Sequence, residues 1–243
     1  MNDVKKINRQ FFMSLMMMIG VVILAAAGIV LLYIFVKNEN ITYPVTLLIF
    51  IGLIIGGSLF KNRLDRITNM SYLVRIRESQ GQPLPITQLV NFNTSSNLFK
   101  KNGFDKYQDN ETFTIYYKCE LDHIKKIFRN NILTVMVLIK NKNTDFYLDR
   151  IDKEINKLRD QLFKEKRKVN RIIITQIKEI DELDDKTRDM IKEIIFVRTK
   201  SFVISTINIG IYRPQHIAVM LYSNTYSPSL YYKYHLDEIR NIL

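Results

Sequence analysis

The stretch FFMSLMMMIGVVILAAAGIVLLYIFV, which runs from Phe11 to Val36 without a charged residue, decides the fold. A helix that rises about 1.5 Å per residue needs roughly 20 apolar residues to cross a hydrocarbon layer about 30 Å thick. The stretch exceeds this length and therefore predicts a transmembrane helix over residues 11–36.

A second apolar stretch, YPVTLLIFIGLIIGGSLF, runs from Tyr43 to Phe60 and ends at Lys61. Its length lies at the short end of the range for a membrane span, and Pro44 lies near its start, where a helix tolerates proline. Residues 11–60 therefore predict a hairpin of two transmembrane helices, with spans at 11–36 and 43–60.

A cleaved signal peptide is the alternative interpretation of the first stretch. Three cations precede it within residues 1–10, and Ala25-Ala26-Ala27 resembles a cleavage site. The apolar run nevertheless continues from Gly28 to Val36, where a signal peptide should give way to a polar segment. We therefore expect both helices to remain in the mature protein.

The charges that flank the two spans predict their orientation. Three cations lie in the N-terminal segment 1–10, whereas the loop after the first span holds one Lys and one Glu. By the positive-inside rule, both termini of this multi-pass cell-membrane protein are cytoplasmic. Five further cations follow the second span, and we expect them to contact anionic lipid headgroups. These are Lys61, Arg63, Arg66, Arg75 and Arg77.

Two glycines in the second span, Gly52 and Gly56, form a G-x-x-x-G pair, which allows another helix backbone to approach closely. We expect the partner to be the first helix, through Ala25 and Gly28, rather than a partner subunit. Neither span contains Asp, Glu, Lys, Arg or His, which argues against a proton relay or an ion pathway within one subunit.

The composition excludes several classes of protein. With 47% hydrophobic residues among 243, the chain can bury enough surface to fold, and its single Cys excludes a disulfide framework or a Cys-rich zinc site. The formal net charge is +12, but the chain is also rich in Ile and Asn and lacks Trp, as expected from an AT-rich genome. Nucleic acid is therefore a possible partner that no motif supports.

The segment that follows the hairpin is predicted to contain a cytoplasmic mixed α/β domain. Residues 61–85 form a basic juxtamembrane segment and a linker with Gly and Pro punctuation (SQGQPLP), and the domain covers residues 86–243. Hydrophobic periodicity and capping residues predict the elements of the domain in the following order. They are a short helix capped by Thr94-Ser95-Ser96 and ending at Asn102-Gly103, a half-buried strand at 113–119, a buried strand at 132–139, an amphipathic helix at 145–168, a buried strand at 171–177 parallel to the preceding one, a helix starting at Asp184 whose stripe extends to Ile195, strands near 196–207 and 216–222, and a C-terminal helix.

No cofactor or metal is predicted, because the chain has no Gly-rich nucleotide motif and its Cys and His residues do not form a ligand set. We expect Cys119 to be a structural thiol, and His216 and His235 to be solvated or core histidines. The alternative is a membrane-tethered enzyme or a degenerate restriction-endonuclease-like nuclease that acts on nucleic acid at the inner leaflet, because the element order over residues 95–177 fits such a core. In that nuclease, Asp122 and Lys140 would frame a metal site. Leu138 occupies the position of the second acid, so that site would be incomplete.

Two polar segments could contact a partner or a ligand. The first, Ser205–Pro214, contains Asn208, Gly210 and Arg213, and the second, Tyr222–Ser229, contains Tyr226. The simpler interpretation of both is a strand that runs into a turn and a polar loop. Taken together, the sequence predicts a membrane-anchored α/β protein that acts as a non-catalytic interaction or accessory module, with membrane lipid and an unknown protein as partners.

Overall fold

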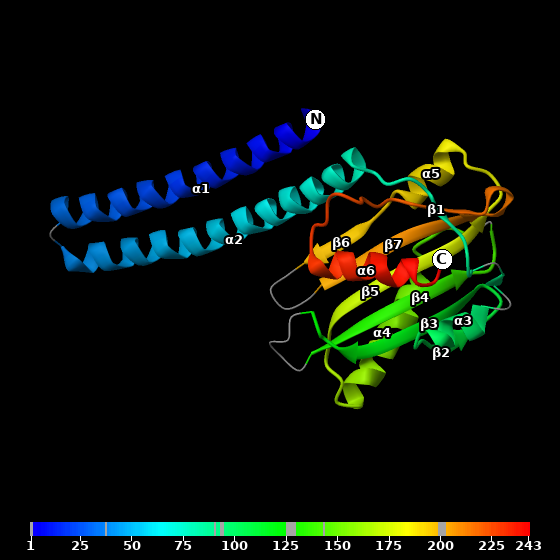
Figure 1. The fold of residues 1–243 in the computed structure, drawn as a ribbon. Coiled ribbons are helices and arrows are strands. Elements are labelled where there is room, and N and C mark those ends of the chain that lie inside the picture. The colour runs from blue at the N-terminus through cyan, green and yellow to red at the C-terminus, as the bar shows by residue number, and fades with distance from the viewer. Residues whose placement is uncertain are drawn as a thin grey trace. The chain divides into compact units, whose positions relative to one another are not determined.

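The computed structural model describes residues 2–36, 38–89, 91–92, 95–124, 130–142, 144–198 and 203–243, without the side chains of residues 2 and 196–198. The chain divides into two compact units, Met1–Glu78 and Ser79–Leu243. The first unit consists of two long apolar helices, and the second is a mixed α/β sheet domain (Figure 1). This division agrees with the predicted order of an apolar helical hairpin followed by an α/β domain.

The first unit is an antiparallel hairpin of α1 (Asn2–Phe35) and α2 (Glu39–Glu78). Asn38 caps α2, because its side-chain oxygen accepts a hydrogen bond from the backbone N–H of Asn40 at 3.0 Å. At the opposite end of the hairpin, the Arg75 guanidinium donates a hydrogen bond to the Asn8 side chain at 3.4 Å. The two helices therefore lie side by side over most of their length.

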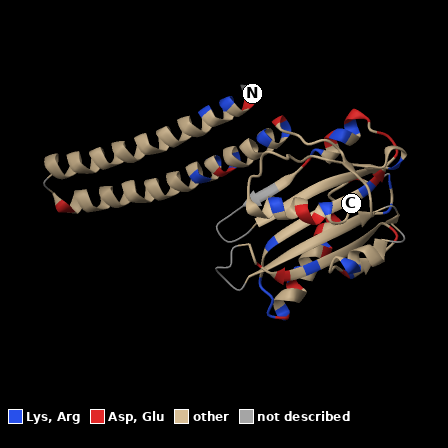
Figure 2. Cartoon of the chain, in the orientation of Figure 1, with Lys and Arg blue, Asp and Glu red and all other residues tan. Residues whose placement is uncertain are grey.

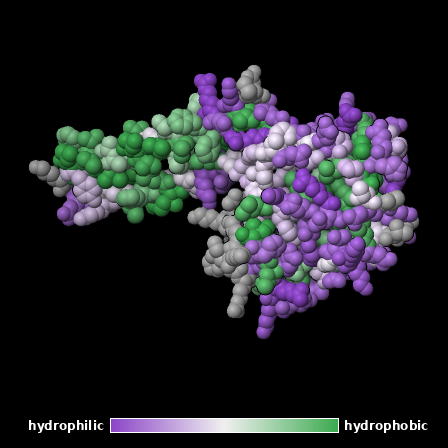
Figure 3. All heavy atoms as spheres, in the orientation of Figure 1, coloured by the Kyte–Doolittle hydropathy of each residue, from purple (hydrophilic) through white to green (hydrophobic). Residues whose placement is uncertain are grey.

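Both helices are long and apolar enough to span a membrane, and no residue in the most apolar 18-residue stretch of either helix is buried. Figure 3 shows this apolar surface along the hairpin. Leu24, Phe35 and Ile54, for example, expose 73%, 77% and 72% of their surface. The hairpin therefore presents apolar side chains outward on nearly every side.

The helix that contains the second span continues well beyond Phe60. The expected juxtamembrane segment is helical as far as Glu78, because the chain has no Gly or Pro between Gly57 and Gly81 to end a helix. Residues 61–78 add about 27 Å to α2 at about 1.5 Å per residue. The helix also begins earlier than expected, at Glu39, so that Pro44 lies inside it.

The glycine pair does not bring the two helices into close contact, so the expected packing is wrong. A Cβ atom placed on Gly28, Gly52 or Gly56 would meet no atom within 4 Å. The first helix instead uses another stripe, on which Ile7 and Ser14 are buried and Ala25 is partly buried, whereas Gly28 is exposed. This stripe points in a different direction from Gly28.

The second unit contains one mixed sheet, which within the described residues has the strand order β1-β8-β7-β5-β4-β3-β2, with β6 paired to β7 outside this path. Its strands are β1 (Leu84–Pro85), β2 (Asp105–Asp109), β3 (Phe113–Leu121), β4 (Asn131–Ile139), β5 (Val169–Ile180), β6 (Ile195–Arg198), β7 (Val203–Tyr212) and β8 (Ile217–Met220). Its helices are α3 (Ser95–Lys101), α4 (Asp149–Lys164), α5 (Asp185–Ile191) and α6 (Leu230–Arg240), with a 3-10 turn at Arg213–Gln215.

The centre of the sheet is parallel. Strand β5 pairs in parallel with β4 on one side and with β7 on the other. The parallel β4–α4–β5 unit was predicted, and so were the burial of β4 and the apolar stripe of α4, in which Ile151, Ile155, Leu158 and Leu162 are buried. Helix α4 packs on one face of the sheet, whereas α3 and α6 cover the other (Figure 1).

Several predicted boundaries are wrong. The domain begins at Ser79 rather than near residue 86, because the expected linker already pairs with the sheet through β1 and through a bridge from Gln80 to Ser223. Helix α4 is shorter than 145–168, and α5 ends at Ile191, so Ile195 belongs to a strand. The single strand expected near 196–207 is instead an antiparallel pair, β6 and β7, and Thr94 lies outside the described residues.

Strand β3 is buried on both faces at its start, not on one. Alternating residues were expected to face solvent, yet Thr114 and Tyr116 are each only 4% exposed. The reason is α3, whose Phe99 ring stacks on Tyr116 at 4.3 Å between ring centroids. Gly103, with a φ of 79°, ends this helix as predicted and returns the chain to β2.

Replacement of Phe99 by Ala should destabilise the second unit by about 3–5 kcal/mol, because the Phe99 ring is fully buried and the change leaves a cavity beside Tyr116. Hydrogen exchange of the β3 and β4 amides in the full-length chain measures the effect. Phe99→Leu should cost less, and the exposed change Lys101→Ala should cost almost nothing. Unchanged protection in Phe99→Ala would contradict the packing role of α3.

Candidate functional site

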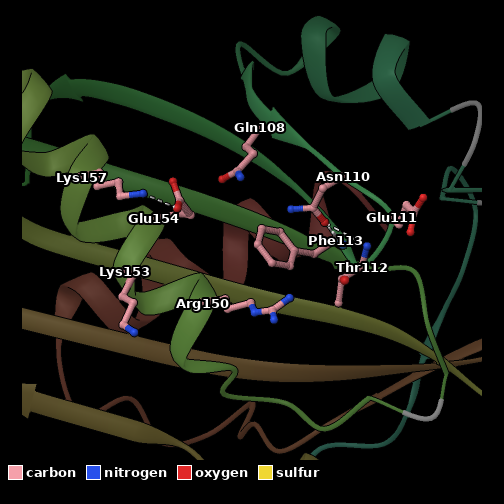
Figure 4. A pocket seen from close by; sticks show the side chains of 9 residues that line it. All are labelled: Gln108, Asn110, Glu111, Thr112, Phe113, Arg150, Lys153, Glu154 and Lys157. Carbon is pink, nitrogen blue, oxygen red and sulfur yellow. Dashed lines mark hydrogen bonds and ion pairs between the residues drawn. The ribbon is translucent and has the colours of Figure 1, made fainter.

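A polar hollow of about 420 Å³ lies between the β2–β3 turn and α4 (Figure 4). It is found near the edge of the sheet where the parallel strands end, the edge at which α/β proteins generally bind ligands. The residues that line it are Gln108, Asn110, Glu111, Thr112, Phe113, Arg150, Lys153, Glu154 and Lys157.

The β2–β3 turn forms one wall of the hollow. The Asn110 side chain accepts hydrogen bonds from the backbone N–H groups of Thr112 and Phe113, at 2.9 and 2.8 Å, and so fixes the turn. Behind the turn, the Asp109 carboxylate accepts hydrogen bonds from Lys106, Lys140 and Thr114. These partners, Lys106 first, hold the pKa of Asp109 well below its usual range, so this carboxylate is a fixed anion.

Helix α4 forms the opposite wall. Arg150, Lys153, Glu154 and Lys157 share one helix face because they occupy positions i, i+3, i+4 and i+7. Lys157 and Glu154 form an ion pair at 2.7 Å. Arg150 and Lys153 are exposed and form no ion pair with any described residue. These two cations therefore remain able to bind an acidic group.

The hollow contains groups that can bind a polar ligand. Buried Phe113 lies at its base, and the buried side-chain oxygen of Gln108 has no hydrogen-bond partner among the described residues. None of the nine lining residues is His, Cys or Ser. The lining thus combines two available cations with amide groups and the exposed carboxylate of Glu111, and the two cations suit an acidic group on a polar ligand.

The structure does not gather the residues that the sequence predicted as contacts with a partner or ligand. Asn208 is fully buried, and its amide donates to the backbone carbonyl of Met190 at 3.0 Å, which ties β7 to the end of α5. A Cβ atom on Gly210 would lie 2.5 Å from the end of the Ile191 side chain, so this glycine serves packing. Both residues are therefore inaccessible to a partner.

The two remaining residues of that set lie in turns. Arg213 begins the 3-10 turn after β7 and donates a hydrogen bond to Glu179 at 2.8 Å. The backbone N–H of Tyr226 donates to the Ser223 hydroxyl at 3.0 Å in the loop before α6. Both side chains are partly exposed, so a partner contact at either one stays a prediction.

The arrangement expected for a nuclease is not present. Asp122 follows β3 at the edge where β4 begins, and Lys140 follows the last residue of β4. Nine steps along a strand separate these two edges by roughly 30 Å, so the two side chains cannot hold one metal ion. Asp122 is instead buried against the Tyr231 hydroxyl at 2.5 Å, and Lys140 binds Asp109.

The histidines and the cysteine have structural surroundings. Cys119 is partly buried, and burial raises the pKa of its thiol. His235 is completely buried between the Thr175 and Ser205 hydroxyls, at 2.9 and 3.0 Å, as a core histidine should be. No three His, Cys, Asp or Glu side chains gather as potential metal ligands within the described ranges.

Sequence reasoning missed a polar layer between α6 and the sheet. Tyr234 donates to Glu120 at 2.7 Å, Lys118 pairs with Glu238 at 2.7 Å, and Tyr231 binds Asp122. One signal was available, because residues 231, 234, 235 and 238 of α6 lie on one helix face. Their partners on three strands could be identified only once the sheet was known.

No protein-family model, curated protein sequence or solved structure matches this chain. Its function must therefore be inferred from its own residues and their geometry.

Stability of the second unit should fall with acid through His235. Burial lowers its pKa to about 3, whereas an unfolded histidine has a pKa of 6.5, so the unfolded chain binds the proton first. The contribution is complete above pH 6.5 and declines towards pH 3, with a loss of about 2–3 kcal/mol by pH 4.5. Hydrogen exchange of the β5 and β7 amides across this range measures the decline.

The matched variant is His235→Gln, which keeps polar atoms near both hydroxyls but cannot be protonated. It should be less stable at pH 7 and should lose less stability than the unmodified chain between pH 6.5 and pH 4.5. Parallel pH profiles for the two proteins would show that His235 does not cause the acid dependence.

Proposed function

We propose that this protein is a membrane-anchored interaction module, with the α1–α2 hairpin inserted in the cell membrane and the second unit on the cytoplasmic side. The observation that carries the proposal is the unburied apolar surface of the two helices. Between Phe11 and Leu59, 24 large apolar side chains are at least 36% exposed. Hydrocarbon suits such a surface of apolar side chains. It also suits the backbone, because the N–H and C=O groups within a helix bond to one another and need no water.

Insertion of the hairpin would remove a large apolar surface from water. Full burial of one large apolar side chain contributes about 1.5–3 kcal/mol, so leaving this whole set in water would cost tens of kcal/mol. Nothing described in the first unit covers these side chains, whereas lipid would cover most of them. The two helices exceed the roughly 20 residues needed for a span, which permits both helices to cross the hydrocarbon layer.

Charge supports the cytoplasmic orientation. The described residues 2–10 and 61–78 hold eight Lys and Arg side chains and three acidic ones, at the hairpin end opposite the α1–α2 turn (Figure 2). The positive-inside rule assigns that end, and the unit that follows Glu78, to the cytoplasm.

The helical form of residues 61–78 divides the five cations expected to contact lipid. Lys61, Arg63 and Arg66 lie within about 8 Å along the helix axis, so they can reach the headgroups. Arg75 and Arg77 lie about 21 and 24 Å beyond Lys61 on an upright helix, more than two Debye lengths at physiological salt. We therefore propose lipid contact for the first three only.

The polar hollow supports the interaction role. Its free cations, Arg150 and Lys153, and its binding groups are suited to an acidic group on a partner. For the nuclease alternative, Asp122 and Lys140 lie at opposite edges of the sheet, so this pair does not support it.

Cysteine accessibility tests the topology. In a Cys119→Ser background, Asn38→Cys in the α1–α2 turn should react with an impermeant maleimide in intact cells. Lys192→Cys in the second unit should react only after the membrane is made permeable. Reaction of both positions in intact cells, or the reverse pattern, would contradict the proposed orientation.

Site-specific crosslinking in native membranes tests the interaction role. A photoreactive residue in place of Lys157 should give a discrete adduct, because this side chain reaches the hollow. The change Arg150→Glu should reduce that adduct at least several-fold, since it reverses one of the two free charges. An equally strong adduct from a photoreactive residue at Lys192, which lies outside the hollow, would argue against a specific partner site.

A further inference from the structure

The amino edge of the sheet, where the parallel strands begin, collects the exposed apolar side chains of the second unit. Leu121, Phe163 and Leu230 expose 67%, 69% and 64% of their surface. The only other large apolar side chain of this unit that is exposed among the described residues is Ile195, at 40%. Phe163 belongs to α4 on one face of the sheet and Leu230 to α6 on the other, so the three apolar side chains are spread along the edge, where one extended surface could contact them all.

Hydrogen bonds place all three residues at this edge. Leu121 ends β3 and pairs with Asn131 at the start of β4, whose N–H donates to the Lys168 carbonyl at 2.9 Å. Phe163 lies in the last turn of α4, directly before the turn that leads to Lys168. The Tyr231–Asp122 hydrogen bond brings Leu230, the first residue of α6, to the same edge.

Cations accompany the apolar residues. The α4–β5 turn carries four exposed cations, and Figure 2 shows this turn in blue. They are Lys164, Lys166, Arg167 and Lys168. The one acid within this run, Glu165, accepts a hydrogen bond from Gln161 at 3.3 Å. Arg171 does not belong to the surface, because it is buried and lies 3.9 Å from Asp122.

We propose that this amino edge is a second membrane-binding surface, specific for anionic lipid. The tips of Leu121, Phe163 and Leu230 enter the boundary between headgroups and acyl chains, and the four cations of the α4–β5 turn contact the lipid phosphates. Apolar tips and cations along the same edge match a surface whose outer layer is anionic and whose next layer is hydrocarbon. A second copy of the same basic edge would be repelled by like charge.

The inference goes beyond the proposed anchoring, because every residue concerned lies in the second unit. It can therefore be tested in trans. The full-length chain is reconstituted in nanodiscs of neutral phosphatidylcholine, and vesicles with or without phosphatidylglycerol are then added. Recovery of the chain in nanodiscs reports anchoring, and binding of the added vesicles reports the amino edge, so the two proposals can fail separately.

Phe163→Trp provides the readout, because the chain contains no natural Trp. Its emission should shift to the blue on addition of phosphatidylglycerol vesicles, brominated lipid should quench it, and rising salt should reverse the shift. Gln215→Trp, in the exposed turn at the opposite edge, should show none of these changes. Leu230→Trp is the second reporter if Phe163→Trp does not fold.

Charge variants test the cations. In the Phe163→Trp background, Lys164→Gln, Lys166→Gln and Lys168→Gln together should weaken vesicle binding about 100-fold, since each cation contributes roughly fivefold. Loss of the same charge in Lys186→Gln, Arg188→Gln and Lys192→Gln, in and directly after α5, should weaken it much less.

Three results would overturn the proposal. The first is emission that is unaffected by anionic vesicles, and the second is equal weakening by the two sets of charge variants. The third is a blue shift that depends on protein concentration without vesicles, which would assign the edge to contact between copies of this chain.

Discussion

The parallel pairing of β5 with both β4 and β7 is the constraint on which the second unit depends. Ten consecutive pairs join β5 to β7, and the register shift in the β4–β5 pairing lies at Asn131, so the rows across the sheet are fixed. One such row contains Lys118, Thr134, Ile173 and Ser205, and the next row on the same face contains Tyr116, Met136, Thr175 and Ile207. A shift of one residue in the strand register would exchange the two faces of a strand. The hydroxyl groups that bond to His235 would then face α4.

This register explains how the sheet can carry an apolar face and a polar one. On the α4 side, Leu133, Val135 and Ile174 form a continuous apolar layer. On the α6 side, several buried or partly buried polar groups of the sheet meet a partner that the helix supplies, as Lys118 meets Glu238 and Thr175 and Ser205 meet His235. Such a layer adds little net free energy, but an incomplete one is costly, so it specifies where α6 sits.

The sequence was sufficient to predict an element where a local pattern of residues alone indicated its surroundings. The uncharged run that begins at Phe11 identified α1, and the 3-and-4 spacing from Ile151 to Leu162 identified α4. It was insufficient where distant segments decide the outcome. Burial of Tyr116 depends on Phe99, which no periodicity in β3 reveals, and the division between β6 and β7 depends on their pairing. The polar hollow likewise needs the β2–β3 turn and α4 side by side, although they are far apart in the chain.

The uninterrupted course of α2 has a mechanical consequence. A helix without Gly or Pro from Ser58 to Glu78 behaves as a stiff rod, so rotation, piston movement or tilt of its apolar part reaches Glu78 with little loss. In the proposed inserted state, helices adopt tilts from about 0 to 40°, and a change of about 10° would move the end of an extension of about 27 Å sideways by about 5 Å. A change in bilayer thickness that altered the tilt would then become a displacement at Glu78.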